Sequence, residues 1–483
     1  IVQKGYGPPR GGFRRGGGAP PGRRTTAASR KRIVSRQPLT LVRSDDESMI
    51  GVWNIALIRM AARSDILQQA ITEDLEMGAI GKDHVLGFLA EDYMTPEAVE
   101  LVARAREMAP RLAERARAAE AAGMVPVATV QEMKEAGLFR VLQPRRFGGY
   151  ELDPRVFYRA QMALAEGCMS TAWIYGVIGV HNWQLPLFPE QAQQDVWADD
   201  TSVLIASTYM PTGKAEPVEG GYRFSGRWGF SSGVEHCDWI FLGGLLPKKD
   251  GSGELEHTTF LLPKSDFRIE YNWDVLGLRA TGSHDIVVDG CFVPEHRTHR
   301  TNDHSDAGCP GRQTNPSWVY KIPFTQVFQR AVSSACIGAL EGAIASFRAR
   351  AAAHIGKHGA KTAEDVNAQL AVSEAMMLTD QLKLVLFRNY ARIVECARTG
   401  ERMPVEERLM QRAQASQVPK LCATAASELM RACAASGLYK SNPIERVFRD
   451  IHQARGHIAN NADAYARAHG AVMLGLPNAD PYI

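Results

Sequence analysis

A short run near the middle of the 483-residue chain combines residue types that suit a flat aromatic ligand. Trp228 offers a large ring for stacking. Ser231 and Ser232 follow with hydroxyl groups that donate or accept hydrogen bonds, and Gly233 lets the backbone approach a ligand closely. The same residues also suit an ordinary β-hairpin with a tryptophan in its core, because most aromatic residues of strands are buried. The run alone leaves both interpretations open.

Alternating apolar and polar residues on both sides of this run predict the strands that would position it. Residues 221–244 read as a strand, a tight turn and a second strand, with glycines at both ends. Five further stretches are short, β-rich and bounded by turn residues: 203–209, 215–220, 258–263, 267–273 and 283–294. Their spacing predicts a compact β-barrel or sandwich.

Apolar residues at helical spacing precede and follow the β region. Before it, we expect a helix from Ala98 that ends at Gly123 and is kinked or divided at Pro110. Further helices are expected at 127–135, 154–166, 170–180 and 189–196. After the β region, four amphipathic stretches predict an antiparallel four-helix bundle: 325–353, 363–399, 404–436 and 443–468.

The predicted fold class is therefore α+β with several domains. The expected divisions are an extension at 1–48, an N-terminal helical domain at 49–200, a central β domain at 201–310 and a C-terminal helical bundle at 311–483. At roughly 150 residues per domain, a chain of this length is expected to hold about three folded units.

Composition and charge narrow the class of protein. The 45% of hydrophobic and 23% of charged residues are typical of a globular chain. A net charge of +3 favours neither nucleic acid nor a membrane as partner, and no apolar run reaches the length of about 20 residues that a membrane span needs. Eight cysteines without a CxxC pair indicate reduced thiols in a cytoplasmic protein and predict neither a disulfide framework nor a metal site.

The first 48 residues differ in composition from all that follow. They are rich in Gly, Pro and Arg and contain no acidic residue before Asp45, so they cannot bury enough apolar surface to fold. Three interpretations compete: a disordered arm with weak RNA affinity, an organelle transit peptide, and an upstream extension that is not part of the working protein. We favour the last, with Met49 as an alternative start.

Several motifs resemble those of the acyl-CoA dehydrogenase fold, in the same order along the chain. They are GLFRVLQPRRFGGYELDP, SGRWGFSSG, DVLGLRATGSHDIVVDGCFVP and SGLYKSNPIERVFRDIHQARGH, and the resemblance covers residues 97–483. The pieces GVHNWQLPLF and FRDIHQARGHIANN are more similar to one branch, the oxygenase components of two-component flavin-dependent aromatic monooxygenases. This branch includes the oxygenase components of p-hydroxyphenylacetate hydroxylase and of the secosteroid hydroxylase.

One departure separates this chain from the dehydrogenases that it resembles. Many of them carry a catalytic Glu shortly after an Arg-Asp pair, which is Arg449-Asp450 here. The position of that Glu holds Arg455. An arginine stays protonated and cannot abstract a proton, so the sequence argues against dehydrogenation.

The resemblance implies an oxygenase that receives reduced flavin from a separate flavin reductase. With O2 it would form a flavin C(4a)-hydroperoxide and transfer one oxygen atom to a phenolic substrate. FMN is the expected flavin and FAD the alternative, and proteins that resemble this fold are usually homotetramers. No GxGxxG motif stands between a strand and a helix, which agrees with a reductase on another chain.

The resemblance also implies roles for individual residues. Ser232 would lie at flavin N(5) and His457 beside the peroxide. His181, with Ser207 beside it, would meet the hydroxyl of the phenol. A neutral imidazole with an ordinary pKa near 6.5 can accept a phenol proton near neutral pH. Structural alternatives remain, because a histidine in an apolar segment is often a core residue and a serine in a turn often bonds the backbone.

The remaining expectations concern the cofactor and the other histidines. The expected cofactor contacts are Trp228, Ser231, Ser232 and Arg279, although an arginine in an exposed turn is an equally good interpretation of the last. His452 is five residues before His457, about 140° round a helix, and is expected on another face as an indirect partner. His236 is expected at the surface or in a loop.

Three rival functions are kept. The first is an acyl-CoA dehydrogenase with a relocated base, which acyl-CoA-dependent flavin reduction would reveal. The second is a flavin monooxygenase that acts on nitrogen or sulfur. The third is a non-catalytic scaffold whose Arg/Gly-rich arm binds RNA in a salt-sensitive way. The sequence does not name the substrate.

Overall fold

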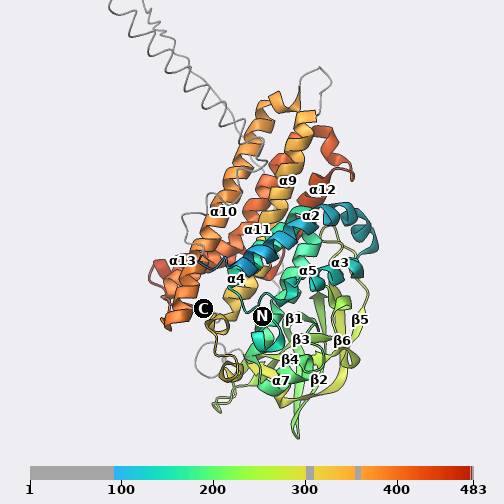
Figure 1. The fold of residues 1–483 in the computed structure, drawn as a ribbon. Helices are drawn as coiled ribbons and strands as arrows, with labels where there is room; N and C mark the ends of the chain where they lie inside the picture. The colour runs from blue at the N-terminus through green and yellow to red at the C-terminus, as the bar shows by residue number, and fades with distance from the viewer. Residues whose placement is uncertain (1–91, 301–308, 354–360, 479, 481–483) are drawn as a thin grey trace, which may run out of the picture. The chain divides into compact units, whose positions relative to one another are not determined.

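The computed structural model of the chain describes residues 92–300, 309–353, 361–478 and 480 (Figure 1). The expected extension at 1–48, and the N-terminal part of the helical domain up to residue 91, lie outside the described residues. Within the described part, no helix combines the length and the apolar character that crossing a membrane would require.

Helices form the first part of the described chain. They are α2 (Pro96–Ala122), α3 (Val127–Glu135), α4 (Pro154–Gly167), α5 (Met169–Gly179), α6 (His181–Gln184) and α7 (Glu190–Trp197). The hydroxyl of Thr95 caps α2 by accepting from the Ala98 amide, and Gly123 ends it with a φ of 71°. Pro110 lies inside α2 without dividing it, contrary to one sequence-based expectation. Beside Pro110 the helix packs closely on α4, where a Cβ on Gly167 would come within 2.1 Å of the Ala109 carbonyl oxygen.

Seven strands make one open sheet. They are β1 (Ile205–Val218), β2 (Gly221–Ser231), β3 (Trp239–Pro247), β4 (Leu255–Pro263), β5 (Arg268–Glu270), β6 (His284–Pro294) and β7 (Thr298–Arg300). Their order is β5-β6-β2-β1-β3-β4-β7, with β1 and β3 parallel and the other neighbours antiparallel. Of the two expected arrangements, barrel or sandwich, the closed barrel is ruled out, because β5 and β7 remain as two separate edges.

Two local expectations about this sheet are also wrong. The segment 221–244 is not a hairpin, because β1 lies between β2 and β3 and pairs with both. The tight hairpin lies one strand earlier, where Val218 pairs with Gly221 and Gly220 adopts a φ of 76°. The two short strands expected at 203–209 and 215–220 are a single long strand, whose first half pairs with β3 and whose second half pairs with β2.

The C-terminal part is helical, with more breaks than the sequence predicts. Its helices are α8 (Phe324–Ala331), α9 (Ser334–Ala353), α10 (Val366–Thr399), α11 (Val405–Ala432), α12 (Pro443–Arg455) and α13 (Ala462–Met473). The expected helix 325–353 is interrupted at Val332 and Ser333, and the expected helix 443–468 is interrupted after Arg455. The second interruption places His457 at the start of the short 3-10 helix Ile458–Asn460, outside α12.

Helices α4 and α5 lie between the bundle helices and the sheet (Figure 1). Helix α4 packs on α2 and α9, and α5 contacts both β1 and α9. Each residue of α5 is buried, so side chains on its different faces meet the sheet and the bundle at once. This makes α5 the element on which residues from the two halves of the chain converge.

Candidate active site

Trp173 on α5 joins two of the residues predicted to act on the flavin. Its indole nitrogen donates to the Ser232 hydroxyl at 3.2 Å. Its ring meets the His457 ring edge-on, with 5.8 Å between the ring centres. Trp173 is 4% exposed, so both contacts lie under the surface. The end of β2 and the segment after α12, more than 200 residues apart in sequence, thus share one tryptophan.

Tyr209 on β1 occupies the corresponding place beside the predicted substrate residues. Its ring lies 6.2 Å from the His181 ring, and the two are perpendicular. The Tyr209 hydroxyl donates to the Gln184 side chain and also interacts with the Ser207 hydroxyl. Burial raises the pKa of Tyr209 well above its ordinary value, so this hydroxyl remains a neutral donor.

Phe328 on α8 connects these two groups of residues. Its ring centre lies 5.4 Å from that of Tyr209 and 6.2 Å from that of His457. A continuous series of contacts therefore runs from His181 through the rings of Tyr209, Phe328 and His457 to Trp173 and onward to Ser232. All four residues predicted to be catalytic contact this series of aromatic side chains.

The hydroxyl of Ser232 has a determined hydrogen-bonding direction. Thr281 Oγ1 donates to the Leu278 carbonyl oxygen at 2.8 Å and lies 2.7 Å from Ser283 Oγ. Ser283 must therefore donate to Thr281, because a hydroxyl carries one proton. Ser283 Oγ also lies 2.7 Å from Ser232 Oγ, so Ser232 donates to it. Ser232 accepts from Trp173 with one lone pair and keeps the other as an acceptor.

Asp450 on α12 anchors the far end of this hydroxyl chain. Its carboxylate accepts the Leu278 amide at 2.6 Å and holds that residue at a φ of 53°. The loop lies so close to α12 that a Cβ on Gly277 would meet the Arg449 carbonyl oxygen at 2.2 Å. Arg449 adds a bond from Nη1 to the Leu276 carbonyl oxygen at 2.7 Å. The Arg-Asp pair thus fixes the helix that ends just before His457 to the loop that orients Ser232.

The two candidate histidines are neutral and present opposite hydrogen-bonding groups. His181 Nδ1 lies 2.5 Å from the Ile205 carbonyl oxygen and must donate to it, and the buried Nε2 has no partner among the described residues. His457 Nδ1 accepts the Ala459 amide at 3.1 Å, so in the neutral ring its proton is on Nε2. Burial lowers the pKa of each to about 4. His181 therefore offers an acceptor and His457 offers a donor.

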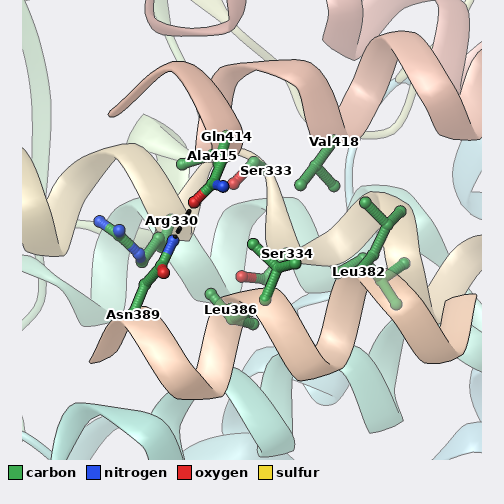
Figure 2. A pocket seen from close by; sticks show the side chains of 11 residues that line it. Arg330, Ser333, Ser334, Leu382, Leu386, Asn389, Gln414, Ala415 and Val418 are labelled. Carbon is green, nitrogen blue, oxygen red and sulfur yellow. Dashed lines mark hydrogen bonds between the residues drawn. The ribbon is translucent and has the colours of Figure 1, made fainter. Parts of the chain in front are cut away.

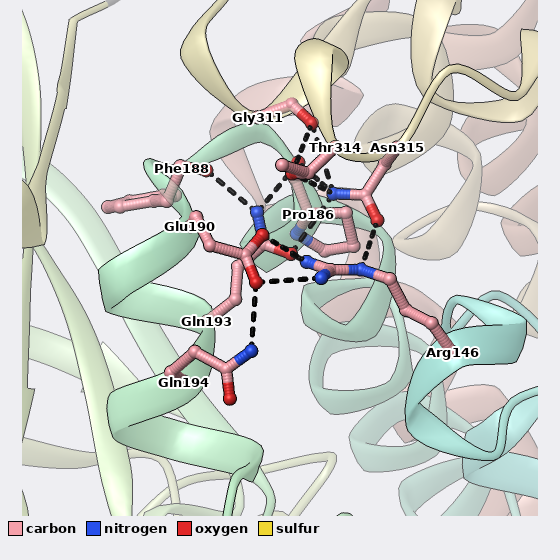
Figure 3. A network of polar contacts seen from close by, with 9 residues as sticks. All are labelled: Arg146, Pro186, Phe188, Glu190, Gln193, Gln194, Gly311, Thr314 and Asn315. Carbon is pink, nitrogen blue, oxygen red and sulfur yellow. Dashed lines mark hydrogen bonds and ion pairs between the residues drawn. The ribbon is translucent and has the colours of Figure 1, made fainter.

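A polar network holds the segment that follows His181 (Figure 3). Arg146 forms a two-pronged ion pair with Glu190, each bond 2.7 Å long, and it holds the pKa of that carboxyl down at about 2. Gln193 donates to the carbonyl oxygens of Pro186 and Phe188, and Asn315 donates to that of Pro186. The backbone just beyond α6 is therefore fixed from two sides, and α6 carries His181 and Gln184.

The other expected cofactor contacts differ from one another in burial and in hydrogen bonding. Trp228 is fully buried, and its indole nitrogen donates to the Met210 and Gly243 carbonyl oxygens, so it is a core residue of the sheet. Ser231 is buried with a hydroxyl that has no partner among the described residues. Arg279 donates to the Val275 carbonyl oxygen at 2.7 Å and is partly exposed.

The other singled-out residues lie away from the aromatic series. His452 Nδ1 lies 2.8 Å from the Phe448 carbonyl oxygen on its own helix, and its Nε2 lies 3.5 Å from Ser427 Oγ. His236 is half-buried in the 3-10 helix Val234–His236. Arg455 is exposed at the end of α12. Among the residues that the structure describes, no group of three or more His, Cys, Asp or Glu is placed to hold a metal ion.

Comparison with known proteins assigns the family. The model of the acyl-CoA dehydrogenase N-terminal domain matches residues 95–201, and that of the acyl-CoA dehydrogenase C-terminal domain matches residues 331–462. The chain is 36% identical to the oxygenase subunit HsaA of a flavin-dependent monooxygenase from Rhodococcus jostii, over 77% of this chain and 98% of that protein. The chain belongs to the flavin-dependent monooxygenase oxygenase subunits. The predicted acyl-CoA dehydrogenase fold and the predicted monooxygenase branch are both confirmed.

Two further comparisons, one with a related protein and one with a crystal structure, agree with this family. It is 26% identical to the oxygenase component of p-hydroxyphenylacetate 3-hydroxylase from Acinetobacter baumannii, over 78% of this chain and 90% of that protein. It superposes on the crystal structure of 3-HSA hydroxylase from Rhodococcus sp. RHA1 with a TM-score of 0.76 and 35% identity, covering 81% of this chain and all of that one.

Sequence reasoning missed the residues that unite the site. The sequence does not single out as functional Trp173, Tyr209, Phe328 or Gln184. It uses Asp450 only as part of the Arg449-Asp450 pair, which marks the position of the missing Glu. A helix that is buried on all sides, such as α5, has no polar face to indicate which residue points at a ligand. The one usable signal was the aromatic side chain of Tyr209, two residues beyond Ser207 and therefore on the same side of the strand.

Asp450 provides a pH-dependent test of the packing in this monooxygenase. Burial raises the pKa of its carboxyl to about 7, against the opposing effect of Arg446 and Arg449 and with support from Glu120. The folded state holds this proton more tightly than the unfolded state, so stability is lost as pH rises from about 4 to 7. Asp450→Asn keeps an oxygen that can accept from the Leu278 amide but does not titrate. Between pH 4 and pH 8 we expect its free energy of unfolding to rise by up to about 4 kcal/mol relative to that of the natural chain.

Urea unfolding of both proteins at several pH values measures this difference. His181 and His457 act in the opposite direction, because their lowered pKa values cost stability as pH falls from 6.5 towards 4. They are present in both proteins and cancel in the comparison. An equal pH dependence for the two proteins would show that Asp450 does not hold its proton in the folded state.

Proposed function

We propose that this chain hydroxylates a phenolic ring with reduced flavin that a separate reductase supplies. The observation that carries the proposal is the pair of neutral imidazoles in the aromatic series, separated by the rings of Tyr209 and Phe328. His181 presents a lone pair, which suits a phenol hydroxyl, and His457 presents an N–H, which suits a developing negative charge on oxygen. Hydroxylation of a phenol needs both properties at once.

The residues around Trp173 fit reduced flavin. The remaining lone pair of Ser232 suits the N(5)–H group that reduced flavin carries, so we assign Ser232 the role of an acceptor there. The hydroxyl of Ser231, which has no partner among the described residues, and the rings of Trp173 and Phe328 give polar and flat contacts nearby. When bound, the reduced flavin supplies the electrons that activate O2. The role of His457 is to donate from Nε2 to the oxygen and to keep water out.

On the substrate side, His181 and Ser207 would hold the phenol. The buried Nε2 of His181 has no partner in the part of the chain that the structure describes, which costs about 1–3 kcal/mol, and a hydroxyl that donates there recovers this cost. Accepting that hydrogen bond also raises the electron density of the phenol ring. The rings of Tyr209 and Phe241 flank His181 and exclude water from this contact.

The flavin is proposed to be FMN, with FAD as the alternative. Structures of similar fold include a Streptomyces protein in complex with FADH2 and another protein in complex with FMN. We also propose a homotetramer. Helix α10 exposes Val366, Leu370, Met376 and Met377, and such a row of apolar side chains on a bundle helix suits contact with a second copy.

One experiment separates the proposal from its rivals. The purified chain is mixed without oxygen with FMNH2 or FADH2, oxygen is added with a panel of phenols, and both hydroxylated product and hydrogen peroxide are measured. We expect product to form at the expense of peroxide with at least one phenol. Product formation from amines or thioethers instead would favour the rival oxygenases. Release of all the oxygen as peroxide, with acyl-CoA compounds reducing bound flavin, would favour the dehydrogenase.

A further inference from the structure

A small cavity lies inside the helical bundle between the α8–α9 junction, α10 and α11 (Figure 2). Its volume of about 20 Å³ is enough for one small ion or one to two water molecules. The lining residues are Arg330, Ser333, Ser334, Ile337, Leu382, Val385, Leu386, Asn389, Gln414, Ala415 and Val418. In Figure 2 the polar side chains gather towards one end and Leu382 and Val418 lie at the other.

Arg330 gives this cavity an uncompensated positive charge. The side chain belongs to a residue that is 1% exposed, and only Nη1 is bonded, to the Gln326 backbone and side-chain oxygens at 2.9 and 2.8 Å. Its Nε and Nη2 have no hydrogen-bond partner among the described residues. The guanidinium lies over the Tyr390 ring, and the groups that act on its charge are Tyr390 and Tyr158, with no carboxylate among them.

A buried cation without an anion is costly, and an arginine cannot lose its proton to escape that cost. Replacing one member of a buried ion pair typically destabilises a protein for the same reason. Nearly all buried arginines are therefore paired. The absence of a carboxylate around Arg330 in the described part of the chain calls for a negative charge from outside the chain.

Two further features of the cavity attract an anion. Ser334 Oγ is also buried, at 1% exposure of the residue, and has no partner among the described residues. Ser334 is also the first residue of α9, a 20-residue helix whose N-terminal end carries unbonded amide groups and a partial positive charge. Arg330 and Ser334 thus both line the same small cavity at the α8–α9 junction.

We propose that this cavity binds a small monovalent anion of the size of chloride, held by Nε and Nη2 of Arg330, which lack a hydrogen-bond partner among the described residues. Its volume excludes phosphate and the flavin phosphate group. It is also separate from the proposed flavin site, because Arg330 lies two residues after Phe328 and therefore about 200° round α8. The inference does not depend on the proposed function.

The bound anion would stabilise the α8–α9 junction and, through it, the segment at 457–460 that carries His457. Gln329, next to Arg330, donates to the Ala459 carbonyl oxygen at 3.1 Å. Asn460 donates to the Val332 carbonyl oxygen at 3.0 Å. The α8–α9 junction is thus bonded on one side to residues 459–460, while its other side lines the cavity.

Halide titration of the full chain tests the proposal. Thermal unfolding is followed in sodium chloride, sodium bromide and sodium gluconate at one ionic strength. We expect chloride and bromide, but not gluconate, to raise the unfolding midpoint in a saturable way by about 2 °C or more. Arg330→Met should abolish this response. The matched control is Arg392→Met, because Arg392 is also on the bundle but pairs with Glu395 and Glu401, and it should keep the response.

A crystal of the unaltered protein soaked in bromide gives a second, independent answer if Arg330→Met does not fold. Anomalous scattering should locate one bromide within hydrogen-bond distance of the Arg330 guanidinium. A halide response that persists in a folded Arg330→Met protein, or a cavity that holds only water in the bromide crystal, would overturn the proposal.

Discussion

Replacing His457 with alanine is expected to lower the rate of product formation by about 100-fold or more, which is the usual contribution of a positioned proton donor. Oxidation of the reduced flavin should continue, and hydrogen peroxide should replace the lost product. The reason is the fixed tautomer of this ring, since the Ala459 amide holds Nδ1 as acceptor and leaves the proton on Nε2. Hydroxylated product and peroxide measured in the same reaction give the result.

Two variants control this prediction. His457→Asn keeps a side-chain N–H and should restore part of the product yield. His452→Ala removes a histidine five residues earlier, whose ring packs on Phe448 with 4.2 Å between ring centres, and should leave the ratio of product to peroxide unchanged. If His457→Ala binds flavin normally and still forms product at the natural rate, the donor role is wrong.

Replacing His181 with leucine should lower kcat/KM for the phenol by about 100-fold. The variant loses the buried acceptor that would bond the phenol hydroxyl, while the flavin side of the site is untouched. Oxidation of reduced flavin without substrate should therefore be unchanged. Steady-state rates with varied phenol, at saturating oxygen and reduced flavin, measure the effect.

The matched control for His181 is His236→Leu. Burial lowers the pKa of His236 to about 4 as well, and its Nε2 also lacks a hydrogen-bond partner among the described residues, but it does not contact the aromatic series. It should leave kcat/KM for the phenol close to the natural value. His181→Gln, which retains an oxygen acceptor, should recover part of the activity. An equal loss in the His181 and His236 variants would indicate a general effect of burying leucine and not a role in substrate binding.

The pKa of about 4 changes the expected chemistry of His181. An imidazole with an ordinary pKa could take the phenol proton outright near neutral pH, as the sequence suggests. In its buried place it is a weaker base and acts as a hydrogen-bond acceptor, unless a nearby phenolate stabilises the protonated ring. The ring loses water on all sides because it sits among α6, β1 and β3, which no local pattern of residues reveals.

The amino-acid sequence by itself determined the family, the order of helical and β regions, and the identity of the residues that contact the aromatic series. Helix α3 ran from Val127 to Glu135 as predicted, because its ends are marked by local signals that act within a few residues. The argument against dehydrogenation also needed only the sequence, because it depends on the chemistry of one side chain, the arginine at position 455.

Only the tertiary structure decided how these residues meet. The insertion of β1 between β2 and β3 turned an expected hairpin into two separated strands, because strand pairing depends on partners distant in sequence. The same long-range packing placed Trp173 between Ser232 and His457, and it fixed the direction of each hydroxyl and the tautomer of each imidazole. The hydrogen-bonding direction of each hydroxyl and the tautomer of each imidazole depend on which groups lie within hydrogen-bond distance. These distances are set by the tertiary fold and cannot be read from the order of the residues.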